Sequence, residues 1–374
     1  MKLIQISDLH IGKKIKGFSL IEDQKHILNQ VIEVAKKEAV NGVIIAGDIY
    51  DTSVPTVDAV NLFNDFISEL HSMGIKCYIV SGNHDNIHRV SFGSQIMAKE
   101  GIHFAKKYDG EFTPLEIEKN INLWLLPFVR PFDVREFHND FACGSYDEMI
   151  QTIFENASID TLKTNILVAH QFITCNGNNP ERSESETSSL GTMDNIDVSN
   201  FEKFDYVALG HIHKPQPMGR QTVRYSGSPL KYSFSEKKDK KSLIILDIKP
   251  KDITYDFIEF KPLRDMVEIV GTFEEIIKLK PTQDFVRIVL KDEDYILDVK
   301  KKLEPIFENI MEIVYDNSFT QTNNFSDMTL QDEKLSPLEL FKIFYEKQNN
   351  KEMNKEQIDI IKDIFKDLNM EENV

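Results

Sequence analysis

The chain has 374 residues, of which 41% are hydrophobic and 28% are charged. This composition excludes a wholly disordered chain, because it supplies enough apolar surface for a large core, and the length suits two domains or one large domain with an appendage. The formal net charge of −17 at pH 7 excludes a protein that coats nucleic acid by its own charge alone.

The cysteines and the N-terminal residues indicate in which cellular compartment the protein is expected. Cys77, Cys143 and Cys175 have neither metal-type nor disulfide-type spacing, which is typical of a reducing cytosol. The N-terminal stretch contains Asp8 and His10 where a secretory signal needs apolar residues, and no apolar run approaches the roughly 18 residues of a membrane span. We therefore expect a soluble, cytoplasmic protein without a membrane partner.

Short apolar runs alternate with amphipathic stretches up to about residue 260, which predicts an α/β layer architecture. Apolar residues at helical spacing predict helices over 22–39 and 56–73, and Gly74 is placed to end the second. The expected strands are 3–6, 42–46, 77–80, 123–126, 166–169, 206–209 and 243–248.

A smaller α/β unit is expected over residues 263–316. The polar stretch 317–335 has little periodicity and is typical of a linker. Within the smaller unit the expected elements are strands 266–270, 285–290 and 312–315 and helices 272–279 and 296–307.

The last segment, residues 336–374, is expected to form two amphipathic helices. Ser336 and Glu339 make a capping-box pattern with proline at the first helical position, and Asn354 can cap a second helix over 356–368. The apolar stripe on each helix packs either on the chain's own core or on another protein. The polar linker before the helices favours a partner.

Five of the expected strands end in side chains that bind metals. The carboxyl ends of strands in an open α/β sheet are where loops converge. Alternate residues of an extended segment face the same way, so Asp8 with His10, and His211 with His213, can each point into one pocket. The strand-end side chains are Asp8, His10, Asp48, Asn83, His84, Asp85, His170, His211 and His213.

Any one histidine at a strand end is more often the cap of a turn or a satisfied core group. Here five of the ten histidines lie at such ends, together with Asp8, Asp48 and Asn83. The gathering of so many metal-binding side chains at strand ends favours a metal site.

The motifs DLH, GDIYD, GNHD, the lone AH and GHIH resemble the five motifs of the calcineurin-like metallophosphoesterases. YSGSPLKYSF at 225–234 and SPLELFKIFYEKQ at 336–348 are more similar to one branch, the SbcD nucleases of bacterial DNA-repair complexes. The resemblance covers nearly the whole chain. It implies a two-sheet metallophosphoesterase sandwich flanked by helices over 1–262, a small α/β capping domain that contacts DNA over 263–316, and C-terminal helices.

The resemblance also implies two metal sites that share Asp48. Two such ions clamp a phosphate oxygen, generate hydroxide near neutral pH and offset charge in an in-line displacement. Mixed His, carboxylate and Asn ligands suit Mn, Fe or Zn better than Mg, and the resemblance implies manganese. The first ion would be held by Asp8, His10, Asp48 and His213, and the second by Asp48, Asn83, His170 and His211.

Three further residues have expected roles beside these ligands. By resemblance, His84 contacts the scissile phosphate and assists the leaving oxygen, a role that suits a group titrating near neutrality. Asp85 is expected to orient His84 or a metal ligand. Asp51 lies where some relatives carry a histidine, three residues after the bridging aspartate, and is expected to orient a ligand rather than to react.

The acidic net charge calls for other sources of attraction for DNA. Two divalent ions add about four positive charges where the phosphate lies. Lys13, Lys14 and Lys231 follow two of the motifs, with a lysine cluster at 237–241; they either contact phosphate or are ordinary solvated lysines. No G-x-x-x-x-G-K-[ST] loop occurs, so the implied ATPase is another chain, an SMC-like protein of the SbcC type docked on 336–374. A homodimer is also expected.

We therefore expect a metal-dependent DNA nuclease, both a double-strand exonuclease and a single-strand or hairpin endonuclease, acting in DNA repair and recombination. One alternative is another calcineurin-like phosphoesterase that acts on a phosphoprotein or a nucleotide; the long segment after Pro262 disfavours it, because a simple phosphatase core does not need one. The other alternative is a metal-free scaffold, whose mark would be a lost ligand, and none is missing.

Overall fold

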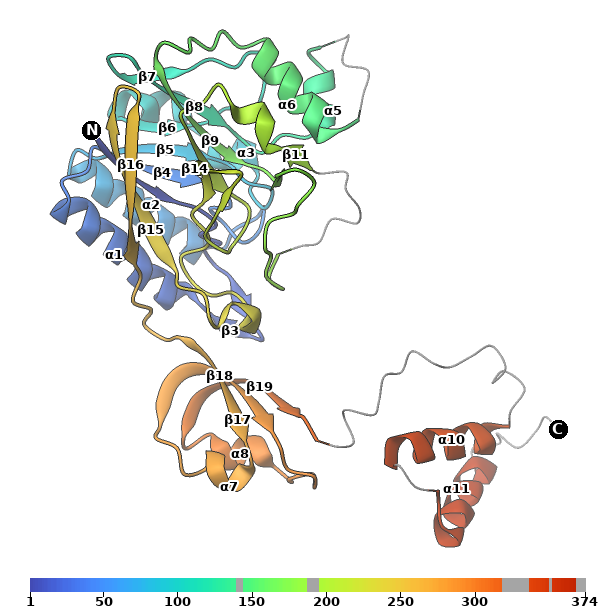
Figure 1. Cartoon of the computed structure of the whole chain (residues 1–374). Helices are drawn as coiled ribbons and strands as arrows, with labels where there is room; N and C mark the ends of the chain where they lie inside the picture. The colour runs from blue at the N-terminus through green and yellow to red at the C-terminus, as the bar shows by residue number, and fades with distance from the viewer. Residues whose placement is uncertain (139–143, 187–194, 318–335, 350–351, 368–374) are drawn as a thin grey trace. The chain divides into compact units, whose positions relative to one another are not determined.

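The computed structural model describes residues 1–138, 144–186, 195–317, 336–349 and 352–367. The chain forms two compact units, Met1–Met266 and Val267–Val374, and Figure 1 labels their helices and strands. Cys143 and almost all of the predicted linker, residues 318–335, lie outside the described residues.

The first unit contains a sheet of six strands. In chain order they are β1 (Lys2–Ile6), β4 (Gly42–Ala46), β5 (Lys76–Val80), β6 (Ile102–Phe104), β15 (Ser242–Lys249) and β16 (Asp252–Glu259). Their order in the sheet is β16-β15-β1-β4-β5-β6. β1, β4, β5 and β6 run parallel, whereas β15 is antiparallel to β1. The carboxyl ends of β1, β4 and β5 therefore meet at one edge.

A second six-stranded sheet faces the first. Its strands are β7 (Leu115–Glu118), β8 (Ile121–Leu126), β9 (Thr164–His170), β12 (Tyr206–Gly210), β13 (Gln216–Met218) and β14 (Arg220–Tyr225). The order is β13-β14-β12-β9-β8-β7, and the central strands β8, β9, β12 and β14 run parallel. Gly210 pairs with His170 in this register, so the loops after β9 and β12 leave the sheet side by side.

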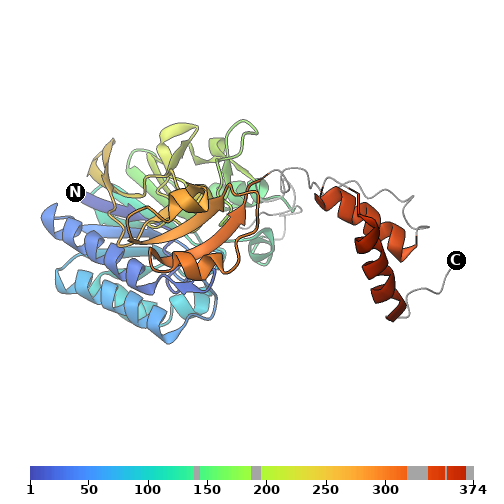
Figure 2. The same ribbon diagram turned by 90° about the horizontal axis from the view of Figure 1, so that it is seen from below.

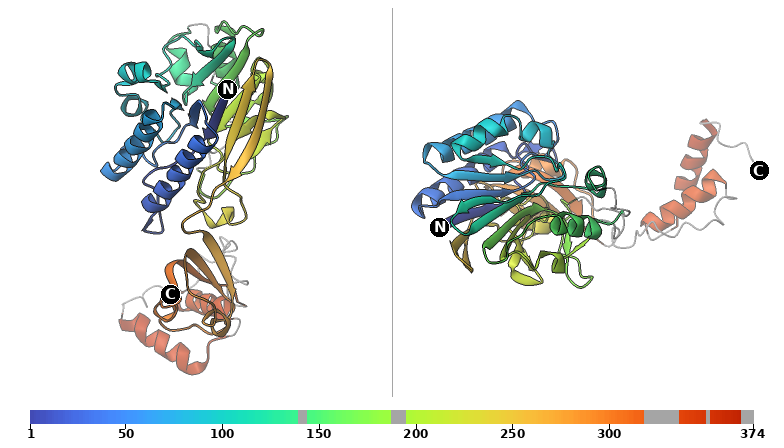
Figure 3. Two further views of the ribbon diagram at one scale, coloured as in Figure 1. Left: turned by 90° about the vertical axis from the view of Figure 1, so that its left-hand side faces the viewer. Right: turned by 90° about the horizontal axis from the view of Figure 1, so that it is seen from above.

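Apolar side chains fill the space between the two sheets. Leu3 and Tyr78 of the first sheet and Ile166 and Tyr206 of the second belong to one buried cluster. Helices α1 (Ile21–Lys37) and α2 (Val57–Ser72) lie side by side and cover one outer face (Figures 2 and 3). Helix α6 (Tyr146–Glu155) packs on the second sheet. The predicted two-sheet sandwich flanked by helices is confirmed.

Short elements make up the connections of the first unit. They are β2 (Lys14–Ile15), β3 (Phe18–Ser19), α3 (Ile87–Val90), α4 (Ser94–Met97), α5 (Pro131–Arg135), β10 (Ile173–Thr174), β11 (Ile196–Asp197) and the 3₁₀ turns Ala98–Glu100, Val198–Phe201 and Phe234–Glu236.

The second unit has a three-stranded sheet in the order β17-β18-β19. Its elements are β17 (Met266–Gly271), α7 (Phe273–Ile276), β18 (Thr282–Leu290), α8 (Val299–Leu303) and β19 (Phe307–Tyr315). β18 and β19 are parallel, and α7 and α8 contribute Ile276 and Leu303 to a core that includes Val286 and Phe307.

Both helices of this sheet are shorter than predicted. Residues 296–307 have helical spacing of apolar residues, yet α8 covers only Val299–Leu303 and β19 starts at Phe307. Phe307 is fully buried and pairs with Thr282, so this residue belongs to a strand of the sheet and not to the predicted helix. Here tertiary packing outweighs the helical spacing of apolar residues in the sequence.

Two helices, α10 (Pro337–Asn349) and α11 (Lys355–Asp367), follow the sheet in sequence. Both predicted caps are present: Ser336 and Glu339 exchange hydrogen bonds, and Asn354 Oδ1 accepts from the backbone N–H of Gln357. No helix in the described ranges combines the length and the apolar character that a membrane span needs.

Candidate metal centre

The structure brings the predicted metal-binding side chains together where strands of both sheets end. Asp8, His10 and His213 form one group, Asp8, Asp48 and His170 a second, and the potential ligand atoms within each group lie within 4.8 Å of one another. Because the first sheet supplies β1, β4 and β5 and the second supplies β9 and β12, the centre exists only when the two sheets face each other.

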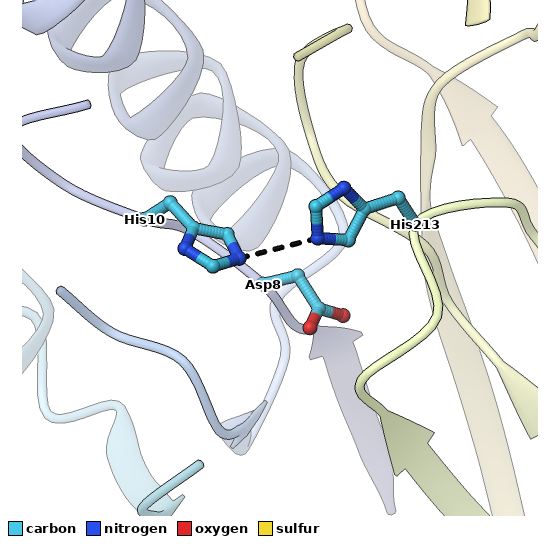
Figure 4. Close-up of side chains that lie close together, drawn as sticks. All are labelled: Asp8, His10 and His213. Atoms are coloured by element: carbon cyan, nitrogen blue, oxygen red, sulfur yellow. Dashed lines mark hydrogen bonds between the residues drawn. The ribbon is translucent and has the colours of Figure 1, made fainter. Parts of the chain in front are cut away.

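The first half of the centre is formed by Asp8, His10 and His213 (Figure 4). His10 Nε2 and His213 Nε2 face each other at 3.2 Å across the space above the Asp8 carboxylate. All three side chains are buried. Asp8 is further held by Ser7 Oγ at 2.5 Å and by the backbone N–H of His211 at 2.9 Å.

The second half is formed by Asn83, His170 and His211. Asn83 Oδ1 lies 3.1 Å from His170 Nε2 and 2.9 Å from His211 Nδ1. His170 Nδ1 lies 2.8 Å from the carbonyl oxygen of Ala46, which accepts its proton. That contact directs His170 Nε2 at the centre, where a metal ion would replace the proton on this nitrogen.

Asp48 lies between the two halves. Its Oδ2 is 3.6 Å from His10 Nε2 on one side and 3.2 Å from His170 Nε2 on the other. Its Oδ1 accepts from the backbone N–H of His84 at 2.9 Å. This central position is the one that a bridging carboxylate requires.

The backbone at the strand ends is held in an unusual conformation. Asp8, His10, Asp48 and His211 have φ values of 53°, 44°, 48° and 103°, in the region that L-residues rarely adopt. Such backbone strain persists where surrounding structure fixes it and is concentrated at functional sites. The strain turns these side chains inward instead of letting each strand continue.

Two glycines give the ligands room. A Cβ at Gly82 would lie 2.1 Å from Asp48 Oδ1, and a Cβ at Gly210 would lie 1.8 Å from the carbonyl oxygen of Ala46. Gly82 thus lets the loop after β5 approach Asp48, and Gly210 lets β12 approach β4 of the facing sheet.

Burial and mutual charge shift the pKa values of the centre strongly. Burial raises the pKa of Asp8 to about 6, and burial together with the charge of His170 lowers the pKa of His211 to about 3. Burial opposes both charges of the Asp48–His170 pair, yet their attraction prevails: it raises the pKa of His170 to about 9 and holds the pKa of Asp48 well below its ordinary value. A metal ion would replace the proton on His170.

The donor set fits divalent metal ions. His10 Nδ1 is buried and has no hydrogen-bond partner among the described residues, since Asp51 Oδ1 lies 3.4 Å away without hydrogen-bond geometry. The facing nitrogens of His10 and His213 share a hydrogen bond at 3.2 Å, and a metal ion would replace the proton between them. Imidazole, carboxylate and amide ligands in this mixture suit Mn, Fe or Zn.

His84 lies at the edge of the centre. Its Nδ1 is 2.9 Å from the backbone oxygen of Asp51, and its ring stands edge-on to the His10 ring at 4.8 Å. A ring nitrogen of His84 can reach the same ion as His10 and Asp48 by distance alone, so its expected catalytic role stays a prediction.

The two aspartates predicted to orient neighbours act in different ways. The Asp51 carboxylate lies beside His10 and binds Lys13 Nζ at 2.7 Å, and its expected orienting role stays a prediction. The expected role of Asp85, to orient His84 or a metal ligand, also stays a prediction. Asp85 accepts three backbone N–H bonds, from Gly82, Ile49 and Tyr50 at 2.9–3.1 Å, and so joins the loop after β5 to the loop after β4.

Several lysines proposed for DNA are engaged within the chain. Lys13 pairs with Asp51, and Lys231 Nζ lies 2.8 Å from Asp265. Lys241, from the cluster expected at the surface, is buried and pairs with Glu236 at 2.6 Å. Lys14 is exposed on β2, and its contact with DNA phosphate stays a prediction.

Sequence reasoning missed the side chains behind His213. His213 Nδ1 lies 2.7 Å from Ser185 Oγ, and Ser185 donates to Glu236 Oε1 at 2.7 Å. Lys241 Nζ binds Glu236 Oε2 and also donates to the backbone oxygen of His213. No motif marks these residues, because they approach one another only through long-range folding.

The family models and the similar proteins that match this chain all indicate one family. Residues 1–215 match the calcineurin-like phosphoesterases, and residues 262–349 match the Type 5 capsule protein repressor C-terminal domain. A protein of Staphylococcus epidermidis, named as the SbcD component of the nuclease SbcCD, is 32% identical over 98% of each chain. A protein of Staphylococcus saprophyticus with the same name is 33% identical over 92% of each chain.

A solved dimetal phosphatase from Danio rerio overlaps at a TM-score of 0.40 and 10% identity, over 69% of this chain and 95% of its own. An overlap at this score carries no part of the assignment, which rests on the sequence matches. By those matches the chain belongs to the calcineurin-like phosphoesterases and, within them, to the SbcD family of nucleases.

Proposed function

We propose that this chain is a metal-dependent nuclease that hydrolyses phosphodiester bonds of DNA in repair and recombination. The observation that carries the proposal is the buried centre in which Asp48 lies between two ligand groups. Family membership favours a nucleic acid as the substrate, because both of these relatives are named as nucleases. We infer both a double-strand exonuclease and a single-strand or hairpin endonuclease activity.

Different residues of the chain have different roles in the proposed reaction. Two divalent ions, when bound, polarise the phosphate and supply a hydroxide nucleophile near neutral pH. Asp48 would hold them at a fixed spacing, with Asp8, His10 and His213 on one side and three ligands on the other. The backbone oxygen of Asp51 accepts from His84 Nδ1, so proton transfer to the leaving oxygen would take place at His84 Nε2.

Manganese is the ion we propose for both sites. Four imidazoles stand among the predicted ligands, and magnesium prefers oxygen and water. The same ligands also accept iron and zinc, so metal-dependent rates decide the assignment.

We also propose that α10 and α11 bind an SMC-like ATPase of the SbcC type. The rings of Phe341 and Phe365 pack edge-to-face at 6.0 Å and join the two helices. None of the side chains described in these helices is buried, and Phe344, Ile360 and Ile364 are 48%, 59% and 45% exposed. Apolar residues left uncovered on a capped helix pair suit a protein partner.

DNA contact by the small domain 263–316 and a homodimer complete the proposal. Phe92, in the turn between α3 and α4, and Ile96, in α4, are 81% and 73% exposed, and this surface is the first to test for self-association. Light scattering of the purified chain would report a dimer directly.

The decisive experiment for the function compares substrates. The purified chain would be incubated with manganese, magnesium or chelator on linear duplex DNA, hairpin DNA and p-nitrophenyl phosphate. We expect manganese-dependent cleavage of both DNA substrates. Rapid hydrolysis of the phosphomonoester with no cleavage of DNA would favour a phosphatase instead.

A further inference from the structure

A cavity of about 380 Å³ adjoins the metal centre within the first unit. Its wall comes from the loop after β5, from residues 107–108 and from the segment 128–133 that leads into α5. Asn83, which contacts His170 and His211, lines this cavity. A molecule bound here therefore reaches the metal centre, and the volume, at the small end for ligand sites, suits a single nucleotide.

Three aromatic residues line the cavity, of which Tyr108 is buried and Phe128 and Phe132 are not. Phe128 is half-buried; its backbone N–H donates to the Ser81 carbonyl oxygen at 2.9 Å, and its ring stands edge-on to His170 at 6.5 Å. Phe132, at the start of α5, is 76% exposed. Aromatic faces beside a phosphodiesterase centre are what an unstacked base needs, because every base has a face that stacks.

Two cationic side chains accompany the rings. The guanidinium carbon of Arg130 lies 5.6 Å from the centre of the Phe128 ring, and Lys107 is exposed at the rim. Among the described residues, neither Arg130 nor Lys107 forms an ion pair, whereas Lys13, Lys231 and Lys241 all do. In a chain of net charge −17, cations outside any ion pair beside the centre suit phosphate.

The acidic side chains of the cavity already have partners. Asp85 accepts its three backbone N–H bonds. Asp133 accepts from the backbone N–H of Arg130 at 3.0 Å. Both carboxylates are thus turned to the backbone, which leaves the rings and cations to meet a ligand.

We propose that this cavity holds the nucleotide next to the scissile phosphate, an inference that rests on the proposed nuclease function. The base stacks on Phe132 and Phe128, and the next phosphate of the strand binds Arg130 and Lys107. The cavity thereby selects an unstacked strand and accepts any base, because stacking and charge carry no base identity.

The test compares two phosphodiesters with manganese present. A single-stranded oligonucleotide offers a base and a flanking phosphate, whereas bis(p-nitrophenyl) phosphate offers neither. Phe132→Ala and Arg130→Gln should each lower kcat/KM for the oligonucleotide about 10-fold, within the range that alanine substitution of a stacking residue gives, and leave bis(p-nitrophenyl) phosphate within twofold. Equal losses on both substrates, or no loss on either, would overturn the proposal.

Matched variants and a binding measurement complete the design. Lys106→Gln, beside Lys107 but paired with Asp109, and Leu162→Ala, at an 88% exposed position outside the cavity, should leave both rates unchanged. Without metal, 2-aminopurine in the oligonucleotide should be quenched by the unmodified chain and not by Phe132→Ala. Unchanged quenching in that variant would contradict stacking.

Two outcomes separate this proposal from the function on which it rests. A chain that hydrolyses bis(p-nitrophenyl) phosphate but no DNA would overturn the nuclease function, while the quenching measurement still decides the cavity. Competition by a free deoxynucleoside monophosphate that Phe132→Ala weakens would assign the cavity to free nucleotide as well as to the strand. Absence of competition, with the oligonucleotide effect retained, assigns it to the strand alone.

Discussion

At the scale of single residues, Asp48 has the most demanding position, because it is buried, has a left-handed backbone and lies between both ligand groups. Asp48→Asn should keep the fold, since asparagine tolerates this backbone conformation. Both ions lose an anionic ligand, so bound metal and DNA cleavage should fall to background. Metal content by mass spectrometry checks this, with the exposed Asp65→Asn as control; two retained equivalents of metal with full activity would refute the bridge.

His84 is predicted to act on the substrate rather than on the metal. His84→Gln should keep metal occupancy and lower the cleavage rate by roughly 10²–10⁴-fold, the usual contribution of a general acid or base. His88→Gln, at an exposed position on α3, is the matched control. Parallel loss of metal and activity would make His84 a ligand instead, as its distance to His10 and Asp48 permits.

Glu236 is predicted to position His213 through Ser185. Glu236→Gln removes the nearer acidic partner of buried Lys241, at 2.6 Å, and leaves only Asp239 at 4.0 Å, which should cost about 3–5 kcal/mol of stability. It should also weaken metal binding by about 10–100-fold, the usual effect of losing a group that supports a ligand.

Thermal unfolding and manganese titration measure these two effects separately. The double variant Glu236→Gln with Lys241→Met should recover stability, because the unpaired charge is gone, but should not recover metal affinity. Recovery of both would mean that Glu236 only neutralises Lys241.

At the scale of elements, the helix pair α10–α11 is predicted to be a docking module separable from the metal centre. The Phe341 ring joins the two helices, so a change at this position would disrupt the pair itself. Ile360→Asp is the sharper test because Ile360 is 59% exposed. A charge buried at the interface should abolish the complex with the ATPase and leave manganese-dependent cleavage of single strands unchanged.

Size-exclusion chromatography with the ATPase reads out this prediction. Asp359→Lys, at the exposed neighbouring position, controls for a general effect of charge on α11. Co-elution of the Ile360→Asp chain with the ATPase would show that another surface makes the contact.

At the scale of the whole molecule, the centre depends on how closely the two sheets approach each other. Gly210 of β12 lies against the Ala46 carbonyl of β4, where a Cβ would stand at 1.8 Å. Gly210→Ala should therefore push the sheets apart, destabilise the chain by about 1–3 kcal/mol and reduce metal binding. Gly144→Ala, with open space around it, is the control; unchanged metal affinity in Gly210→Ala would show that the centre tolerates separation of the sheets.

The sequence by itself determined the α/β class and the position of the ligands along the chain. Asp8 with His10, and His211 with His213, repeat at the spacing of an extended backbone, and each follows an apolar strand. These are local properties, and the carboxyl ends of parallel strands meet at one edge by geometry. Convergence of the ligands was therefore predictable without coordinates.

Only the tertiary structure decided what surrounds those ligands. Ser185 lies 28 residues from His213 and 51 from Glu236 along the chain, a separation that no local period encodes. The role of Asp85 rests on backbone N–H groups, and the burial of Lys241 rests on its ion pair with Glu236. A sequence shows which side chains a segment carries, whereas packing between distant segments selects which of them become buried partners and which stay available to a ligand.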